Sequence, residues 1–314
     1  MNTLTAGILE KMAPHNPKKI YLQAPEGLKT RILDIAADLE KEGIDVIIGC
    51  DPTYGACDLR DKEALALGCD LLLHIGHSNF GVTPVLPVVY EPYTLGGDPI
   101  TMLEKHKDKL LHYKTISLLT TIQFISVLEP ATAWLKQQGK EVPFAAQKRN
   151  KKEGLLLGCD QTAALPLQDR VDCFLYIGSG IFHPLGLALK TEKPVFGINI
   201  ETGEWRNFTE EKLRLQKIKA FHMAEAREAE TFGILATMKE GQSFVKAAVG
   251  LKAFLKKHGK RAFILVMDEV TPQKIQGMKL DILVNCSCPR MDEDFSLFKK
   301  PILNPEDVYK LFSE

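Results

Sequence analysis

The chain has 314 residues, of which 45% are hydrophobic and 25% charged, values typical of a soluble globular protein. Lys plus Arg and Asp plus Glu both total 40, so the formal net charge is zero. That balance argues against nucleic acid or an anionic membrane as the main partner. No stretch approaches the roughly 20 apolar residues that span a bilayer, and the first 14 residues lack the apolar core of a signal peptide. We therefore expect a cytoplasmic protein without a membrane segment.

A weak internal repeat divides the chain into thirds. Each third opens with an apolar segment predicted to be a strand, at residues 20–23, 116–119 and 232–235. A short polar loop then leads into a predicted amphipathic helix with apolar residues at i, i+4, i+7 and i+11. These residues are Leu28, Ile32, Ile35 and Leu39; Phe124, Leu128, Ala131 and Leu135; and Phe244, Ala248, Leu251 and Leu255.

Each predicted helix is followed by a glycine, four residues after the last apolar position. These glycines are Gly43, Gly139 and Gly259. Glycine tolerates the left-handed conformation that ends many helices, so each one is a natural stop signal. A second strand is then predicted to end at Cys50, Cys159 or Met267, and a third to begin at Asp70, Asp172 or Asp281. The third strands are apolar nearly throughout, which is typical of strands buried on both faces of a parallel sheet.

These elements predict an α/β fold with three similar small parallel-sheet domains in a pseudo-threefold arrangement. The predicted domains span residues 1–100, 101–205 and 206–314, with a long linking helix over 210–230 and an insertion over 142–152. Any α/β protein contains strand–helix–strand units of similar length. The matching helical stripe and terminal glycine in all three thirds nevertheless favour a true repeat.

One cysteine in each third lies at the carboxyl end of a predicted strand or in the loop that follows. They are Cys57, Cys159 and Cys288, more than 100 residues apart in the sequence, so only the fold can bring them together. Ligands of parallel α/β sheets bind beyond the carboxyl ends of the strands. Three thiolates around a [4Fe–4S] cluster, which usually takes four cysteines, would leave one iron open for a substrate.

The pattern alone leaves this assignment open, because a free cysteine often packs as a small buried hydrophobe. Cys50 also ends a predicted strand and is an alternative to Cys57. Cys286 lies on the same side of its strand as Cys288 and is an alternative to it. Cys69 and Cys173 start or lie within strands and are predicted to be core residues.

Several polar residues also follow the predicted strands. His77 and Ser179 occupy the position after their third strands that Cys288 occupies after its own, so His77 is expected to face the central site, although a structural role fits it equally. Gln123 and Gln242 lie between a first strand and its helix. Backbone N–H groups there can bind a carboxylate, so both residues are candidates for cofactor contacts. His183 is expected to cap or orient the following helix.

Seven short stretches, in order along nearly the whole chain, together resemble the archaeal-type family of 2-(3-amino-3-carboxypropyl)histidine synthases, the first enzymes of diphthamide synthesis. They are PEGLK from Pro25, DPTYGACDL from Asp51, DLLLHIGHS from Asp70, TTIQ from Thr120, LLGC from Leu156, GIFHPLG from Gly180 and CPR from Cys288. Phe124 departs from the pattern, since a histidine is expected after TTIQ in many relatives.

The resemblance implies that Cys57, Cys159 and Cys288 hold a [4Fe–4S] cluster, so that the three domains surround a central iron–sulfur site. It implies that S-adenosylmethionine is the co-substrate, and that its 3-amino-3-carboxypropyl group is transferred by radical chemistry to a histidine of translation elongation factor 2. It also implies a homodimer and an electron donor that the sequence does not identify. Gln123, Gln242 and His77 are then the expected contacts of S-adenosylmethionine, and the loops of Gln123 and Gln242 would meet its amino-acid end.

Three other functions fit parts of the same pattern. Quinolinate synthases also join three α/β units around a three-cysteine cluster, but they do not use S-adenosylmethionine. A non-catalytic subunit could keep the fold and pass electrons to a catalytic homologue. A zinc-stabilised binding module would need a fourth ligand such as His77. Formation of methylthioadenosine from S-adenosylmethionine by the purified chain separates these functions from the synthase.

Overall fold

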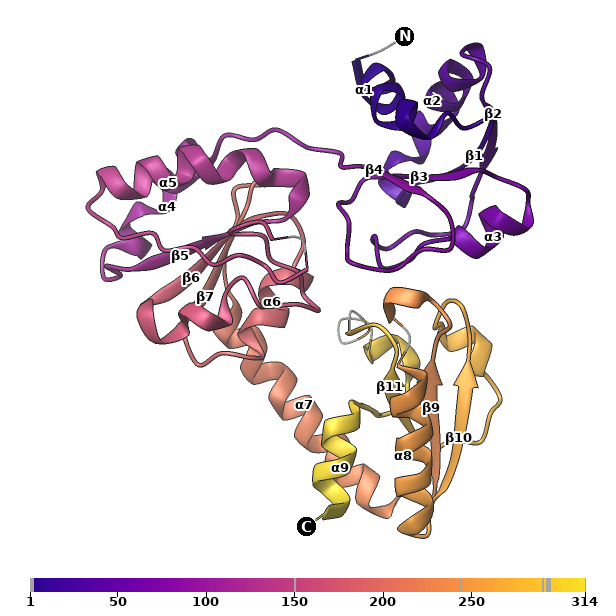
Figure 1. Ribbon diagram of the computed structural model, residues 1–314. Helices are drawn as coiled ribbons and strands as arrows, with labels where there is room; N and C mark the ends of the chain where they lie inside the picture. The colour runs from indigo at the N-terminus through magenta and orange to yellow at the C-terminus, as the bar shows by residue number, and fades with distance from the viewer. Residues whose placement is uncertain (1–2, 150, 243, 290, 292–294, 314) are drawn as a thin grey trace.

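The computed structural model describes residues 3–149, 151–242, 244–289, 291 and 295–313. Over these residues the strands form three four-stranded sheets, one in each of three lobes (Figure 1). The same residues contain no helix that is long and apolar enough to span a membrane. The predicted α/β fold with three similar sheets is confirmed.

The first lobe contains a parallel sheet in the order β2-β1-β3-β4. Its strands are β1 (Lys19–Gln23), β2 (Asp45–Ile48), β3 (Leu71–Ile75) and β4 (Val88–Glu91). Helices α1 (Thr3–Met12) and α2 (Lys29–Lys41) cover one face, and α3 (Asp61–Ala66) lies on the other. All residues of β3 are buried, as expected for a strand covered on both faces.

The second lobe has the order β5-β6-β7-β8, in which only β8 is antiparallel among the described strands. Its strands are β5 (Ile116–Leu119), β6 (Cys173–Gly178), β7 (Val195–Asn199) and β8 (Trp205–Asn207). Helices α4 (Pro99–His106) and α5 (Leu128–Gln137) cover one face, and α6 (Phe182–Ala188) covers the other.

The third lobe repeats the parallel order of the first, as β10-β9-β11-β12. Its strands are β9 (Thr231–Ala236), β10 (Arg261–Val266), β11 (Ile282–Cys286) and β12 (Ile302–Leu303). Helices α8 (Val245–Lys257) and α9 (Pro305–Ser313) cover one face of the sheet.

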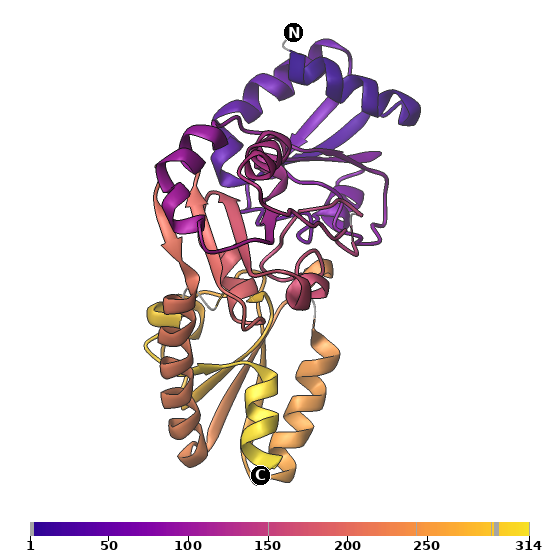
Figure 2. The ribbon, with the colours of Figure 1, turned by 90° about the vertical axis from the view of Figure 1, so that its left-hand side faces the viewer.

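The long helix α7 (Phe208–Glu228) joins the second lobe to the third (Figures 1 and 2). It lies close to the helix predicted over residues 210–230. It packs against β7 at one end and against β12 and α9 at the other, so it belongs to the core of both lobes.

The repeat is visible in equivalent hydrogen bonds. An aspartate precedes each third strand, and its Oδ2 accepts two backbone N–H bonds at the start of the first strand. The donors are Lys18 and Lys19 for Asp70, Lys114 and Thr115 for Asp172, and Glu230 and Thr231 for Asp281, at 2.7–3.0 Å. These bonds favour the charged carboxylate and lower the pKa of Asp70 and Asp172.

The predicted helix ends are also confirmed. Gly43, Gly139 and Gly259 have φ values of 81°, 75° and 75°, the left-handed region that favours glycine. The predicted apolar stripes are buried at most positions and differ from the prediction at all three first residues. Leu28 and Phe124 lie in the 3-10 helices η2 (Glu26–Leu28) and η4 (Ile122–Val127), and Phe244 precedes α8 and is 49% exposed.

One predicted strand is absent from the described second lobe. The strand expected to end at Cys159 does not form. The chain pairs with the first strand of this lobe at two isolated bridges, Thr115 with Glu141 and Thr120 with Leu155, and the insertion lies between them in the sequence. Leu157 and Asp160 instead pair across a tight turn, with Gly158 and Cys159 at its tip. In the first lobe β2 ends at Ile48, two residues before Cys50.

Candidate active site

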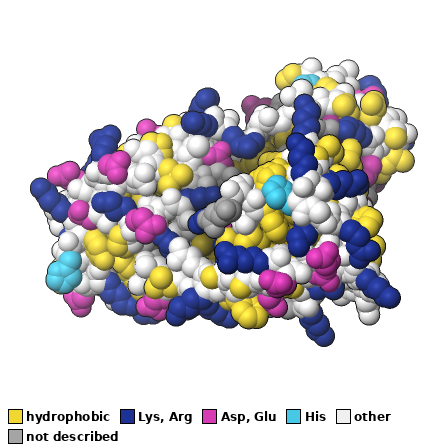
Figure 3. Space-filling view, turned by 90° about the horizontal axis from the view of Figure 1, so that it is seen from below, with side chains coloured by type: hydrophobic (Ala, Val, Ile, Leu, Met, Phe, Trp, Pro, Cys, Tyr) yellow, Lys and Arg dark blue, Asp and Glu magenta, His cyan; other side chains and the backbone are white. Residues whose placement is uncertain are grey.

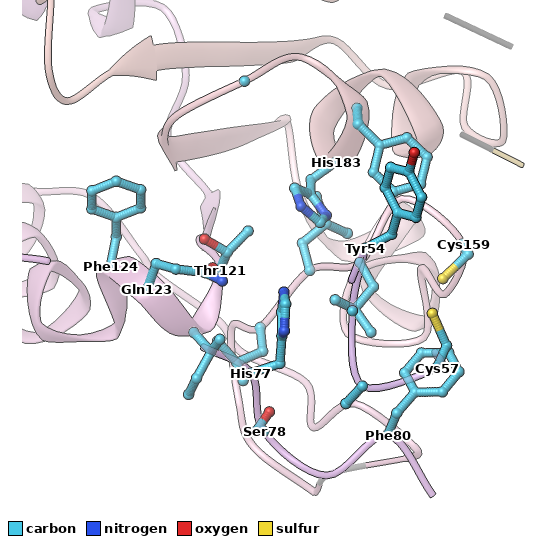
Figure 4. Close-up of a pocket in the computed structure, with 18 of the residues that line it drawn as sticks. Tyr54, Cys57, His77, Ser78, Phe80, Thr121, Gln123, Phe124, Cys159 and His183 are labelled. Atoms are coloured by element: carbon cyan, nitrogen blue, oxygen red, sulfur yellow. The ribbon is translucent and has the colours of Figure 1, made fainter. Parts of the chain in front are cut away.

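A cavity of about 400 Å³ lies among the loops of the three lobes (Figure 4). Its lining comes from loops that follow strands of all three sheets. Residues 54–57 and 77–80 belong to the first lobe, 121–124, 155–159 and 179–183 to the second, and 242 and 288 to the third. From below, hydrophobic side chains gather in the recess between the lobes (Figure 3). The site is thus assembled at the carboxyl ends of strands, as parallel α/β folds favour.

Cys57, Cys159 and Cys288 all line this cavity, one from each lobe. Figure 4 shows the sulfur atoms of Cys57 and Cys159 pointing toward one another. Cys50 is exposed and does not line the cavity, and Cys286 is buried in the core of the third lobe. The fold therefore places Cys57 and Cys288 in the cavity and their alternatives outside it. The strand pattern had left both choices open.

The predicted core positions of Cys69 and Cys173 are confirmed, since both side chains are buried. Arg290 of the CPR stretch lies outside the described residues.

The surrounding protein governs the chemistry of the cavity thiols. Cys159 is solvent-exposed at the tip of its turn, yet partial desolvation by the cavity walls raises its pKa, with further contributions from Cys57 and Cys288. Burial also raises the pKa of Cys57, and the Gln242 amide opposes this effect. Three neighbouring thiolates would repel one another. The arrangement therefore suits thiols that are deprotonated when a positively charged metal group binds to them.

The described residues contain no group of three His, Cys, Asp or Glu side chains placed to hold a single metal ion. A zinc ion needs its ligands within one tight tetrahedron, whereas the cysteines of a [4Fe–4S] cluster bind different irons and stand farther apart. Three cysteine thiols are the ligand type that iron–sulfur clusters use, so the donor set fits such a cluster.

Cys57 is held by a loop of the third lobe. Gln242, predicted as a cofactor contact, lines the cavity and donates from Nε2 to Cys57 Sγ at 3.3 Å. The Gly241 N–H donates to the Cys57 carbonyl at 3.0 Å. A Cβ at position 241 would lie 2.5 Å from Cys57 Cα, so the close approach requires glycine.

Charged residues that the motifs did not single out connect the first and third lobes. Lys239 Nζ lies 2.6 Å from Asp58 Oδ2, and the two side chains are only 4% and 1% exposed. Arg60 pairs with Asp268 at 2.6 Å. The sequence contained one indirect indication that Asp58 lies near the site, because Asp58 directly follows the candidate ligand Cys57.

The remaining predicted residues also reach the cavity. Gln123 lines it and donates from Nε2 to the Gly76 carbonyl at 3.3 Å, across the first and second lobes. His183 lies in the first turn of α6, and its Nδ1 accepts the Gly158 N–H at 3.1 Å. His183 therefore supports the turn that carries Cys159. Phe124, which departs from the family pattern, forms part of the apolar wall.

His77 lines the cavity and pairs with a second, fully buried histidine. His77 Nδ1 lies 3.0 Å from His74 Nε2. Burial lowers the pKa of His77 to about 4, and burial together with the neighbouring His77 lowers the pKa of His74 well below its usual value. Both rings are therefore neutral at pH 7.

This pair predicts a loss of stability in mild acid. In the unfolded chain His77 binds a proton near pH 6.5, whereas in the folded chain it stays neutral down to about pH 4. The contribution of neutral His77 to stability is complete above pH 6.5. The free energy of unfolding should fall by about 3 kcal/mol as the pH is lowered from 6.5 to 4. Denaturation of wild type and His77→Gln across this range measures the effect. The variant should lose less stability, and parallel curves would contradict the assignment.

Known proteins resemble this chain over almost its full length. The model of the family described as “Putative diphthamide synthesis protein” matches residues 24–314. A 2-(3-amino-3-carboxypropyl)histidine synthase of Pyrococcus horikoshii is 33% identical over 96% of this chain and 87% of its own length. Subunit 1 of the human 2-(3-amino-3-carboxypropyl)histidine synthase is 29% identical over 93% of this chain and 67% of its own length. The crystal structure of Dph2 from Pyrococcus horikoshii with a 4Fe-4S cluster superposes with a TM-score of 0.90 at 33% identity, covering 98% of this chain and 90% of that one.

Proposed function

The chain belongs to the family of diphthamide synthesis proteins and is a 2-(3-amino-3-carboxypropyl)histidine synthase, and we propose that its reaction takes place in the central cavity, with Cys57, Cys159 and Cys288 holding the [4Fe–4S] cluster. The enzyme carries out the first step of diphthamide synthesis, on a histidine of translation elongation factor 2. The observation that carries the site assignment is the meeting of three cysteine side chains, one from each lobe, in one cavity.

A bound, reduced cluster would supply one electron to break the Cγ–S bond of S-adenosylmethionine and release methylthioadenosine. The 3-amino-3-carboxypropyl group would then replace the hydrogen of an imidazole carbon of the substrate histidine, and the adduct would give back one electron and lose that hydrogen as a proton. The protein's contribution is to bind and orient the two substrates and to exclude water. Its cavity of about 400 Å³ falls within the usual range of small-molecule sites, about 300–1,000 Å³.

The described lining of the cavity carries no acidic or basic side chain apart from its histidines and cysteines. The ionic partner of the sulfonium is then the cysteine site itself. Tyr54, Phe80 and Phe182 supply flat aromatic surface for an adenine ring, and aromatic faces also attract a cation.

The direct test uses the full chain, reconstituted anaerobically with iron and sulfide and then reduced. Incubation with S-adenosylmethionine should release methylthioadenosine. Added elongation factor 2 should gain the mass of one 3-amino-3-carboxypropyl group, and a factor lacking the target histidine should not. A quinolinate-synthase-like enzyme or an electron-transfer subunit would produce neither result. An iron-loaded, reduced chain that makes no methylthioadenosine would refute the assignment.

Three further features of the proposal do not depend on the geometry of the cavity. We infer a homodimer, a cytoplasmic location and a separate protein that donates electrons to the cluster. Light scattering of the purified chain tests the dimer. Reduction of the cluster by cell fractions, followed as loss of its visible absorbance, would identify the donor.

A further inference from the structure

A buried chain of hydrogen bonds leads from the backbone of the first lobe to the central cavity. The Arg60 backbone N–H donates to Gln23 Oε1 at 2.9 Å, and Gln23 Nε2 donates to the Asp58 carbonyl at 2.8 Å. A backbone N–H can only donate and a carbonyl can only accept, so the two partners together set the orientation of the amide. Gln23 Nε2 also lies 2.9 Å from His74 Nδ1. Gln23 and His74 are 1% and 0% exposed.

This orientation determines where the protons lie on both histidines. Because Gln23 Nε2 is a donor, His74 Nδ1 must accept, and a neutral His74 then carries its proton on Nε2. His74 Nε2 donates in turn to His77 Nδ1 at 3.0 Å. His77 therefore accepts at Nδ1 and carries its own proton on Nε2. The low pKa values of both rings agree with neutral imidazoles.

We propose that His77 presents its Nε2–H to the carboxylate of S-adenosylmethionine and that Gln23 and His74 are the positioning residues that keep this proton in place. The inference rests on the proposed function, because it requires S-adenosylmethionine in the central cavity. Figure 4 shows the His77 ring between Gln123 and the two labelled cysteines.

The cavity lining gives a reason for this contact. The described lining residues include no Lys or Arg, so the donors that they offer to a carboxylate are neutral. A hydrogen bond to an ionised oxygen is stronger than one between neutral groups. The opposite tautomer would turn a lone pair toward the carboxylate and repel it. The buried chain excludes that tautomer.

The first experiment replaces the donor by an acceptor of the same shape, Gln23→Glu. An ionised carboxylate at this position can only accept, so it should draw the proton of His74 to Nδ1 and that of His77 to Nδ1 as well. Nitrogen-15 spectra of the full chain before cluster reconstitution should report Nε2–H on both histidines in the wild type and Nδ1–H in the variant. Wild-type His77 protonated on Nδ1 would overturn the proposal.

The second experiment does not depend on the folding of Gln23→Glu. Calorimetry on the oxidised, cluster-loaded enzyme, which cannot start the reaction, compares the binding of S-adenosylmethionine with that of its decarboxylated analogue. His77→Leu should reduce the preference for the carboxylate-bearing ligand by about tenfold or more. His77→Gln can accept from His74 and donate to the cavity, so it should keep most of the preference. His112→Leu, at an exposed histidine of the second lobe, is the control and should behave as wild type.

An unchanged preference in His77→Leu, or an equal loss of affinity for both ligands, would overturn the inference. Such a result would leave the proposed function intact as long as the reduced wild-type enzyme still forms methylthioadenosine. Absence of methylthioadenosine in the wild type would instead refute the function.

Discussion

Replacing Cys57, Cys159 or Cys288 individually by alanine should remove the brown absorbance of the reconstituted chain and lower methylthioadenosine formation by on the order of 100-fold or more. The three thiols reach the cavity from three lobes, and the described lining contains no other cysteine and no carboxylate to replace a lost ligand. Iron and acid-labile sulfide per chain, measured together with methylthioadenosine, report binding and activity separately.

The same experiment has matched controls within the chain. Cys50→Ala removes an exposed thiol outside the cavity, and Cys286→Ala removes a buried thiol of the third-lobe core. Both variants should keep the iron content of the wild type, although the second removes core volume and should unfold more easily. A Cys159→Ala enzyme with full iron and activity, or a Cys50→Ala enzyme without iron, would show that the ligands are wrongly assigned.

Lys239→Met should lower the free energy of unfolding by about 3 kcal/mol, because it removes the nearest cation from a buried carboxylate and leaves Asp58 the longer contact with Arg60 Nε at 3.8 Å. Asp58 and Lys239 are almost completely buried and lie 2.6 Å apart between the first and third lobes. Burial raises the pKa of Asp58, and the Lys239 ammonium is the main influence that opposes this rise. Denaturant unfolding of the full chain measures the loss of stability.

Two further variants separate this buried pair from ordinary surface charge. Lys41→Met removes an exposed ammonium 2.9 Å from Asp38 and should change stability little. The double variant Asp58→Asn, Lys239→Met buries no unpaired charge, so it should be more stable than Lys239→Met alone. Because Asp58 adjoins Cys57, the single variant should also take up less iron. A Lys239→Met chain as stable as Lys41→Met would contradict the role of the pair.

Much of the fold was predictable because it depends on local patterns. The helical stripe of Ile32, Ile35 and Leu39 and its counterparts at Ala131 and Ala248 are buried as expected. Spacing of this kind specifies which face of a helix packs on a sheet, wherever that sheet lies. The strand expected to end at Cys159 was the exception. Apolar residues there resemble a strand, but the chain forms two isolated bridges with the insertion over residues 142–152 between them in the sequence, and periodicity carries no information about such a break.

The site was predictable only in part. Position relative to strand ends placed Cys57, Cys159 and His77 near ligand-binding loops, and the family resemblance chose Cys57 over Cys50. The ion pair of Lys239 with Asp58 and the buried chain through His74 were not predicted. Their partners lie far apart in the sequence or point inward from a strand without a distinctive motif.

By itself, the sequence determined the repeated α/β units, the ends of their helices and a list of candidate cysteines near strand ends, because these follow from the spacing and type of neighbouring residues. Only the tertiary structure decided which thiols share a cavity, which charges are buried together and which nitrogen of His77 carries the proton. These properties depend on distances between side chains from different lobes and on their removal from water, and neither quantity is defined until the lobes pack together.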